Sequence, residues 1–370
     1  MPQQRIVIAS VLKPVLDTRL YEKLGLSLAQ KNKYEINIIG FFSKNIPTVP
    51  FIRFYPVFSF KRNSIKRFFA SCKYYILLRK VKPSIIIVST AELLIVSVLY
   101  KILFGSKLYY DVQENYYRNI RYTSTYPAPI RRGLAWAVKI IEDSAGRWID
   151  RYLLAEECYA YERNFPGHKS VIVRNKFKPL KRVQPAKPLS LLPKIRLLYT
   201  GTVAENYGIF KAIEFAKKIS IIYPDFTLKI VGFSPKAHVV EKVEAEIRDF
   251  PFISLKTGKI PIPHNEIIDS ISEADFALLP YQPDKSIENC FPTKIWEYMA
   301  HGLPMIIQNH PQWVNYCQKH ESCIAIDFNG YDPEQVLSEI LNRKFYPLGL
   351  PTDVFWNSEE LTLIQSIENG

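Results

Sequence analysis

The chain has 370 residues, which is longer than one hydrophobic core usually supports, and its 48% hydrophobic and 14% aromatic content excludes a disordered protein. Its five cysteines are scattered without a C-x-x-C pair, which argues against structural zinc and for a reducing compartment. The net charge is +14, and residues 1–175 hold 28 Lys and Arg against 12 Asp and Glu. We therefore expect only the first half to face a polyanion, either membrane headgroups or nucleic acid.

The first residues predict a parallel α/β sheet. Residues 5–11 are a short β-branched run, residues 20–31 place leucines at helical spacing, and residues 35–42 form the next apolar run. A strand, a helix and a strand within this length make a βαβ unit. No G-x-G-x-x-G follows the first strand, so a dinucleotide fingerprint is absent.

Residues 51–82 combine aromatic and basic side chains. The helical part of this stretch includes the cations Arg62, Lys66 and Arg67 among phenylalanines and tyrosines. Such a helix can lie in a membrane interface with its cations near anionic headgroups. The alternative is that the aromatic side chains pack on the sheet and the charges face water, as in any α/β domain.

The most apolar stretch, residues 84–104, reads as a buried strand and then a helix shorter than a membrane span, because Glu92 and Lys101 interrupt it. We expect no transmembrane helix and no signal peptide. The next strand, in residues 107–115, ends with Asp111 and Glu114. Open α/β sheets bind ligands at the carboxyl ends of their strands, so both carboxylates are candidate site residues.

After a helix over 128–148 and strands near 151–157 and 170–175, residues 176–194 hold six cations, several prolines and no acid, as expected of a linker. A second α/β series begins with a strand over 195–201. Gly201 and Thr202 end this strand, and their backbone amides are available to an anion. Further strands and helices follow to residue 281, and two such sheets in tandem predict a cleft between domains.

Residues 289–307 predict a loop, a helix that begins at Pro292, a stop at Gly302 and a strand. Lys294 and Glu297 lie three residues apart near the helix N-terminus, where a phosphate is favoured. Glu297 could accept hydrogen bonds from a ribose. The alternative is a solvated ion pair with no binding role.

Five segments together resemble the GT-B glycosyltransferases, specifically the large family 4 of retaining, nucleotide-sugar-dependent enzymes. They are YDVQEN, YTGTVAENYGIFKAIEF, SEADFALLPY, NCFPTKIWEYMAHGLPMII and FWNSEELTLI. The resemblance implies two Rossmann-like domains with parallel sheets facing a central cleft. It divides the chain into an acceptor-binding domain at 1–175, a linker at 176–194, a nucleotide-sugar-binding domain at 195–350, and a segment at 351–370 whose helix crosses back onto the first domain.

The resemblance also assigns roles to residues. Glu297 would hold the ribose hydroxyls, and Lys294 with the amides of Gly201 and Thr202 would hold the diphosphate. The same donor loop contributes Phe291, Pro292 and Thr293, and the backbone of Lys259 and Ile260 would meet the base. The catalytic candidates are Asp111, Glu114 and Asn289. The last of these stands where the family has a glutamate that faces the transferred sugar.

The chain departs from the family at further positions. Thr202 and Tyr207 stand where cations near the diphosphate are frequent, and Gln113 stands where a histidine is common. No D-x-D sequence and no His/Cys cluster occurs, so we expect no metal and no cofactor besides the donor substrate, a UDP- or GDP-sugar.

The resemblance implies transfer of a sugar to a glycan or lipid-linked acceptor in cell-surface polysaccharide biosynthesis, retaining and without metal, by a cytoplasmic enzyme peripheral at the inner face of the membrane. We expect an anionic membrane surface as a partner, and no nucleic acid. One alternative is a nucleotide-sugar 2-epimerase of the same fold. Another is a non-catalytic basic binding protein, for which no nucleic-acid motif is found.

Overall fold

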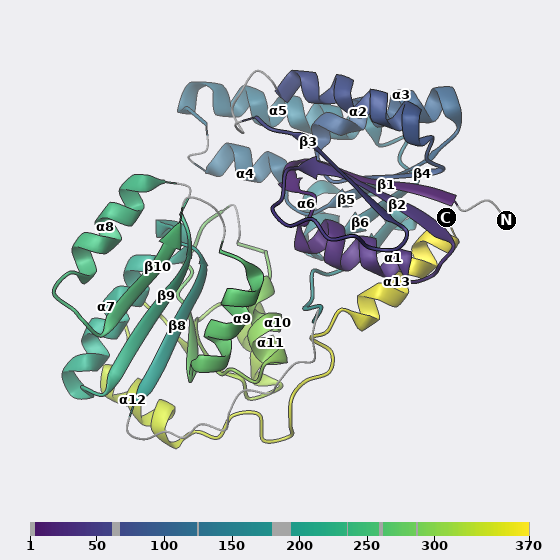
Figure 1. The fold of residues 1–370 in the computed structure, drawn as a ribbon. Helices are drawn as coiled ribbons and strands as arrows, with labels where there is room; N and C mark the ends of the chain where they lie inside the picture. The colour runs from purple at the N-terminus through teal and green to yellow at the C-terminus, as the bar shows by residue number, and fades with distance from the viewer. Residues whose placement is uncertain are drawn as a thin grey trace. The chain divides into compact units, whose positions relative to one another are not determined.

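The computed structural model describes residues 4–60, 67–123, 126–179, 194–234, 236–258, 262–285 and 288–369. The chain divides into two compact units, the first formed by Met1–Leu180 with Trp356–Gly370 and the second by Lys181–Phe355 (Figure 1). Each unit is built on one parallel β-sheet covered by helices on both faces. The predicted fold class of two Rossmann-like domains is confirmed.

The first unit has a seven-stranded sheet in the order β3-β2-β1-β4-β5-β6-β7. Its strands are β1 (Gln4–Pro14), β2 (Tyr34–Phe41), β3 (Ile52–Phe58), β4 (Ile85–Val88), β5 (Lys107–Val112), β6 (Arg151–Leu154) and β7 (Ser170–Ile172). In register, Ile6 pairs with Ile36 on one side and with Ile85 on the other. The strand order reverses direction at β1 and β4, which is the arrangement of a doubly wound sheet.

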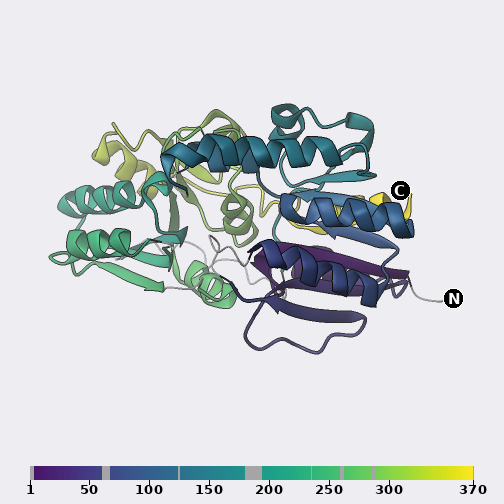
Figure 2. The same ribbon diagram turned by 90° about the horizontal axis from the view of Figure 1, so that it is seen from above.

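Two helical layers cover this sheet. A π-helix (η1, Thr18–Gly25), α1 (Leu26–Ala29) and α13 (Asn357–Glu368) lie on one face, where Ile6, Ile8 and Tyr109 meet them in the core. On the other face α2 (Phe68–Val81), α3 (Ala91–Phe104) and α5 (Ala128–Ala145) lie side by side (Figures 1 and 2). The short helices α4 (Tyr116–Tyr122) and α6 (Cys158–Arg163) follow β5 and β6.

The terminal helix α13 belongs to the first unit. Trp356, Leu363 and Ile367 are buried in the same core cluster as β1 and β2. The Trp356 Nε1 group donates a hydrogen bond to Ser27 Oγ at 2.9 Å. The prediction that the chain crosses back to its first domain is therefore confirmed.

The second unit has a six-stranded sheet in the order β10-β9-β8-β11-β12-β13. Its strands are β8 (Ile195–Thr202), β9 (Phe226–Phe233), β10 (Ile253–Gly258), β11 (Phe276–Leu279), β12 (Met305–Gln308) and β13 (Cys323–Ile326). Helices α7 (Ile209–Ile222), α8 (Ala237–Ile247) and α12 (Pro333–Asn342) pack on one face, and α9 (His264–Glu273), α10 (Thr293–Ala300) and α11 (Pro311–Gln318) on the other (Figure 1). A 3-10 turn (Glu205–Tyr207) precedes α7.

Several local features differ from the sequence-based expectation. Ile52–Phe58 is a strand, β3, which pairs with β2 and was not predicted. The first predicted helix begins as a π-helix at Thr18, capped by the Asp17 side chain. Pro292 is the residue before α10 and not its first residue. Across the described part of the chain, no helix is both long and apolar enough to cross a bilayer.

Candidate functional site

The second unit contains a cavity of about 240 Å³ at the carboxyl ends of β8 and β11. The strand order reverses between these two strands, and open α/β sheets bind ligands at such a switch point. The lining residues come from the ends of β8 and β11, the 3-10 turn before α7, the segment before and within α10, and α11; they are Thr202, Tyr207, Tyr281, Cys290, Phe291, Pro292, Thr293, Lys294 and Trp313. The fold therefore places the predicted donor loop where a ligand is expected.

Gly201 lets the Lys294 side chain reach the end of β8. Gly201 has φ +103°, and a β-carbon at this position would lie 2.0 Å from Lys294 Nζ and 2.5 Å from its Cε. The positive φ favours glycine, and an added β-carbon would displace the end of the Lys294 side chain. The Lys294 ammonium group, on α10, thus lies directly against the backbone of the predicted anion-binding turn.

Lys294 is the only cationic side chain among the residues that line the described cavity. Burial lowers the pKa of its ammonium group, and the negative charge of Glu297 acts in the opposite direction. A bound anion would stabilise the charged form further, because opposite charges in a partly buried site interact strongly. Lys294 is therefore suited to a diphosphate.

Glu297, one turn further along α10, faces His264 at the start of α9. The His264 Nε2 group donates a hydrogen bond to Glu297 Oε1 at 2.6 Å. Burial alone would raise the pKa of Glu297, but the hydrogen bond from His264 and the charges of His264, Lys294 and His301 outweigh it, so the pKa is lowered. His301 donates from Nδ1 to the Glu297 carbonyl at 2.8 Å, and burial lowers the pKa of its imidazole.

Aromatic side chains form one wall of the cavity. Tyr281 packs edge-on against Tyr207 and Trp313, with ring centroids 5.1 Å and 5.8 Å apart. The Trp313 Nε1 group donates to the Cys290 carbonyl at 2.9 Å, which holds the indole against the loop before α10. This wall offers apolar ring faces opposite a single cation, a combination that suits a sugar or base joined to a phosphate.

Two helices begin beside the cavity without a side-chain cap. Helix α7 follows Gly208, whose φ is +74° and whose added β-carbon would lie 1.7 Å from the Pro280 carbonyl oxygen. Helix α10 follows Pro292. Uncapped N–H groups and the helix dipole at these ends favour an anion, which agrees with the position of Lys294.

The structure brings together most of the predicted donor residues. Thr202, Phe291, Pro292, Thr293 and Lys294 line the cavity, and the Phe291 ring stacks on Trp296 with centroids 4.7 Å apart.

The remaining predicted donor residues lie beside the cavity or outside the residues that the structure describes. Gly201 and Glu297 adjoin it through Lys294. Asn289 lies two residues before Phe291 and is not among the lining residues. The predicted contacts of Lys259 and Ile260 with the base fall outside the described residues.

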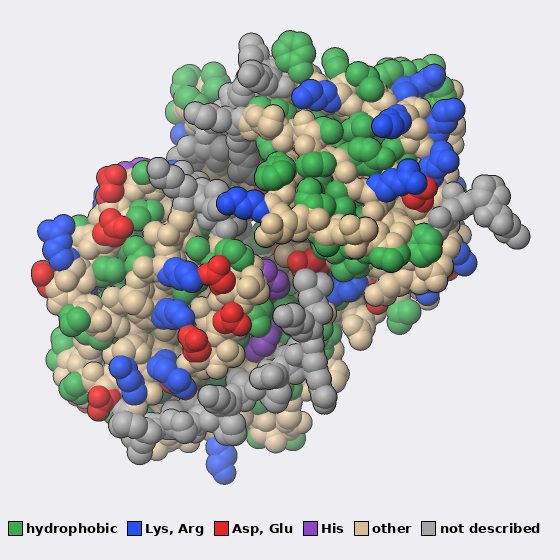
Figure 3. Space-filling view, in the orientation of Figure 1, with side chains coloured by type: hydrophobic (Ala, Val, Ile, Leu, Met, Phe, Trp, Pro, Cys, Tyr) green, Lys and Arg blue, Asp and Glu red, His purple; other side chains and the backbone are tan. Residues whose placement is uncertain are grey.

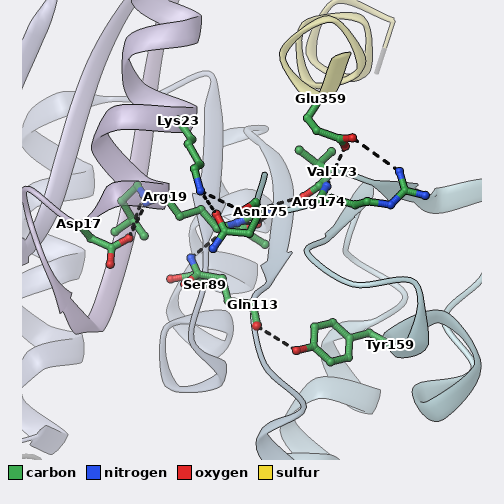
Figure 4. Close-up of polar contacts among 12 residues, drawn as sticks. Asp17, Arg19, Lys23, Ser89, Gln113, Tyr159, Val173, Arg174, Asn175 and Glu359 are labelled. Carbon is green, nitrogen blue, oxygen red and sulfur yellow. Dashed lines mark hydrogen bonds and ion pairs between the residues drawn. The ribbon is translucent and has the colours of Figure 1, made fainter. Parts of the chain in front are cut away.

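Asp111, predicted as a catalytic residue, lies in a buried network of the first unit. Arg19 donates from Nη2 and Nε to Asp111 Oδ1 at 2.6 Å and 2.9 Å, and from Nη1 to the Val173 carbonyl at 3.0 Å. Gln113 Nε2 donates to Asp111 Oδ2 at 2.7 Å. Figure 4 shows Arg19, Gln113 and Val173 of this network. Asp111 has no exposed surface, so the geometry favours a positioning role over contact with substrate.

Glu114, the other predicted carboxylate, is closer to solvent. It accepts a hydrogen bond from Asn119 Nδ2 at 2.9 Å and lies 3.8 Å from Lys13 Nζ. Its side chain is 36% exposed, so a ligand can reach it. Between Asp111 and Glu114, only Glu114 is placed to touch a substrate.

The predicted membrane-facing cations are only partly described. Arg62 and Lys66 fall outside the described residues. Arg67 forms an ion pair with Glu92 at the start of α3, and its side chain is mostly buried. Arg67 therefore links α2 to α3 and is not an open headgroup ligand.

Sequence reasoning missed three features of this site. Tyr281 and Trp313 line the cavity, and His264 pairs with Glu297 across 33 positions of sequence. No sequence period links these residues, because helix order in the fold brings them together. No cluster of three or more His, Cys, Asp or Glu side chains suited to a metal occurs within the described ranges.

Residues 194–342 match the family model described as "Glycosyl transferases group 1", and this match contains the whole cavity. No protein of curated function matches the chain by sequence.

Solved structures resemble the chain over nearly its whole length. Sucrose-phosphate synthase from Thermosynechococcus elongatus is 15% identical with a TM-score of 0.73, and the match covers 99% of each chain. Anabaena HepE in complex with UDP and glucose is 10% identical with a TM-score of 0.68 and full coverage of both chains. A putative UDP-N-acetylglucosamine 2-epimerase from Listeria monocytogenes is 12% identical with a TM-score of 0.62, over 99% of this chain and 96% of that one. At these identities the likeness establishes the fold.

Proposed function

We propose that this chain, whose residues 194–342 match a group 1 glycosyl transferase family model, is a glycosyltransferase that moves a sugar from a nucleoside diphosphate sugar to a glycan or lipid-linked acceptor in cell-surface polysaccharide synthesis. One observation carries the choice of donor. Lys294 lies against Gly201 at the N-terminus of α10, with Glu297 one turn away. A diphosphate and a ribose are the groups that this pair of charges suits best.

The proposed donor lies along α10. Its diphosphate would take the Lys294 ammonium and the backbone N–H groups at the starts of α10 and α7, and its ribose hydroxyls would donate to Glu297. The hydrogen bond from His264 fixes the Glu297 carboxylate and leaves it ionised. An ionised carboxylate is the stronger acceptor for a diol.

In the reaction, the bond between the anomeric carbon and the diphosphate oxygen breaks, and its electron pair leaves with the nucleoside diphosphate. The acceptor hydroxyl forms the new glycosidic bond, and its proton passes to the departing diphosphate. Lys294 and the helix N-terminus stabilise the charge that develops on the leaving group, which needs no metal ion. Asn289 cannot offer a carboxylate to an oxocarbenium-like centre, so we propose that leaving-group stabilisation dominates in this chain.

We propose a retaining outcome and a reaction at the inner face of the cell membrane, where a lipid-linked acceptor is available. UDP and glucose in the HepE complex support a nucleotide-sugar donor for this fold. The cavity does not favour a UDP-sugar over a GDP-sugar. A binding screen decides between these two donors.

The test is a thermal-shift screen of the purified chain against UDP-, GDP-, ADP- and CMP-sugars. A ligand at a hundred times its Kd should stabilise the protein by about 2.7 kcal/mol. Lys294→Met should weaken binding of the matching nucleotide about tenfold or more through loss of a charge-assisted contact. Lys242→Met is the control, because Lys242 is an exposed residue of α8.

Two outcomes would contradict the proposal. If no nucleotide shifts the melting curve and generic DNA binds in a strongly salt-dependent way, the chain is a non-catalytic binding protein. If the purified chain changes UDP-N-acetylglucosamine into its epimer with no acceptor present, it is a 2-epimerase.

A further inference from the structure

Helix α3 presents an apolar face to solvent in the first unit. Ile95, Leu99, Ile102, Leu103 and Phe104 are each between 45% and 60% exposed. The spacing of Ile95, Leu99, Ile102 and Leu103 puts these four on one side of the helix, which is the pattern usually turned toward a core. The opposite side of α3 is also apolar, with Leu93 and Leu94 fully buried. The helix is therefore apolar on both sides.

Neither charged residue of α3 interrupts this face. Glu92 pairs with Arg67, the residue before α2, and Lys101 pairs with Asp150. Both charges are thus directed at neighbouring elements of the same unit. A helix of this length and composition is too short to span a bilayer. Its exposed apolar face instead marks a surface that contacts another apolar partner.

The neighbouring helices extend the apolar surface. On α5, Ile130, Trp136 and Ile140 are each more than half exposed, and on α2 so are Phe69 and Ile76. The three helices form one layer over the sheet (Figure 2). We call this surface the apolar platform; its central residues are Ile76, Ile95, Leu99, Ile102, Trp136 and Ile140.

Cations border and cover the apolar platform. The Arg79 guanidinium lies 4.4 Å from the centroid of the Phe104 ring, and Lys139 lies 5.8 Å from that of Trp136. Helix α2 also carries the exposed cations Lys73 and Lys80 and no acidic residue. Figure 3 shows hydrophobic and basic side chains together over these helices. Long basic side chains beside aromatic rings suit a boundary between water and lipid.

We propose that the apolar platform docks the first unit onto an anionic lipid bilayer, with the exposed side chains of α3 and α5 inserted between headgroups and the flanking cations bound to lipid phosphates. This rests on the proposed function for one point, that the acceptor is lipid-linked. It locates the membrane contact on α3 and α5, because Arg67 is paired with Glu92. A helical layer that is apolar outward and basic at its border has the composition of an interfacial anchor.

Charge separates this partner from a second copy of the chain. In a symmetric dimer the same surface faces itself, so the cations of one platform would meet the cations of the other. Anionic headgroups instead supply opposite charge to the cations at the border, of which Lys139 is also paired with Asp143 of α5. The excess of 28 Lys and Arg over 12 Asp and Glu in residues 1–175 strengthens this attraction at long range.

The test is flotation of the full chain with vesicles of phosphatidylglycerol and phosphatidylcholine, against vesicles of phosphatidylcholine alone. The parent chain should bind the anionic vesicles, and high salt should weaken the binding. Leu99→Glu and Trp136→Glu should each lower binding about tenfold or more, since each puts a negative charge where an apolar group enters the lipid. Ile221→Glu is the matched control, because Ile221 is an 80% exposed isoleucine of α7 in the second unit.

Each result decides the proposal. Loss of binding in the two platform variants, with binding kept by Ile221→Glu and melting curves unchanged, supports it. Equal binding to both kinds of vesicle, no binding, or platform variants that bind like the parent would overturn it. A parent dimer that Leu99→Glu converts to a monomer would assign the platform to a second copy. Lys294→Met should float like the parent, so failure of the donor site and failure of the platform are separable.

Discussion

The Lys294 side chain lies over the α-carbon of Gly201, so close that a β-carbon at position 201 would come 2.0 Å from Nζ and 2.5 Å from Cε. The lysine of one helix and the glycine of one strand end thus form a single structural feature. A side chain at position 201 would therefore displace the Lys294 ammonium group.

Gly201→Ala should displace the Lys294 ammonium and weaken nucleotide binding about tenfold or more. It should also cost about 1 to 3 kcal/mol of stability, since alanine is strained at φ +103°. Isothermal titration with the nucleotide identified by the screen measures the first effect, and denaturant unfolding measures the second. Gly330→Ala is the control, because no atom lies within 4 Å of an added β-carbon there. Unchanged binding in Gly201→Ala would remove Lys294 from the donor site.

Glu297→Gln should destabilise the second unit by about 1 to 3 kcal/mol at neutral pH, because it weakens a charge-assisted hydrogen bond from His264. The folded-state pKa of Glu297 is lowered, so its contribution is present above the unfolded pKa and is lost as pH falls through the folded one. The difference in free energy of unfolding between the parent and Glu297→Gln should therefore become smaller as the pH falls. Melting curves of the parent and the variant from pH 7 down to about pH 3 measure this change.

Glu244→Gln provides the reference for that series, since Glu244 is exposed on α8. The stability of Glu244→Gln should stay close to that of the parent at every pH. A Glu297→Gln difference that grows in acid would mean that the carboxylate is destabilised in the folded state, contrary to the geometry.

The sequence predicted the architecture where local patterns specify it. Apolar runs and helical spacing placed both βαβ series, and the resemblance of the segment around α10 to a donor loop assigned Lys294 and Gly201 to one diphosphate site. The sequence did not predict strand β3, because Ile52–Phe58 contains Pro56 and its residues do not alternate regularly between buried and exposed positions.

The partners of the site residues were harder to predict. His264 meets Glu297, and Trp313 meets Tyr281, only because parallel strand order brings distant helix starts to one edge of the sheet. Asp111 matched a site pattern at a strand end, yet its carboxylate points into the protein toward Arg19. A sequence gives the end of the strand but not the direction that its last side chains take.

Asp111→Asn should destabilise the first unit by about 3 to 5 kcal/mol, because it leaves the buried Arg19 guanidinium without its counter-charge. A double variant, Arg19→Met with Asp111→Leu, should recover much of this loss, since no buried charge remains. Calorimetry of both variants measures the effect. Glu368→Gln is the control, since its partner Lys33 is exposed and the loss should be small.

The alternative for Asp111 has a different signature. A residue that touches substrate would lower turnover while stability stayed near that of the parent. Such a result for Asp111→Asn would restore the catalytic assignment and contradict the positioning role.

Helix α13 packs into the core of the first unit. Trp356 is fully buried in the core of the first unit, and its indole donates to Ser27 Oγ at 2.9 Å. Trp356→Ala should cost about 3 to 5 kcal/mol through cavity formation, and Ser27→Ala about 1 to 3 kcal/mol, since the buried indole N–H then lacks its partner. Leu361→Ala on the same helix, at a 61% exposed position, should stay within about 0.5 kcal/mol of the parent. If Trp356→Ala melts like Leu361→Ala, α13 is not part of the first unit's core in solution, and the crossing back of the chain adds no stability to it.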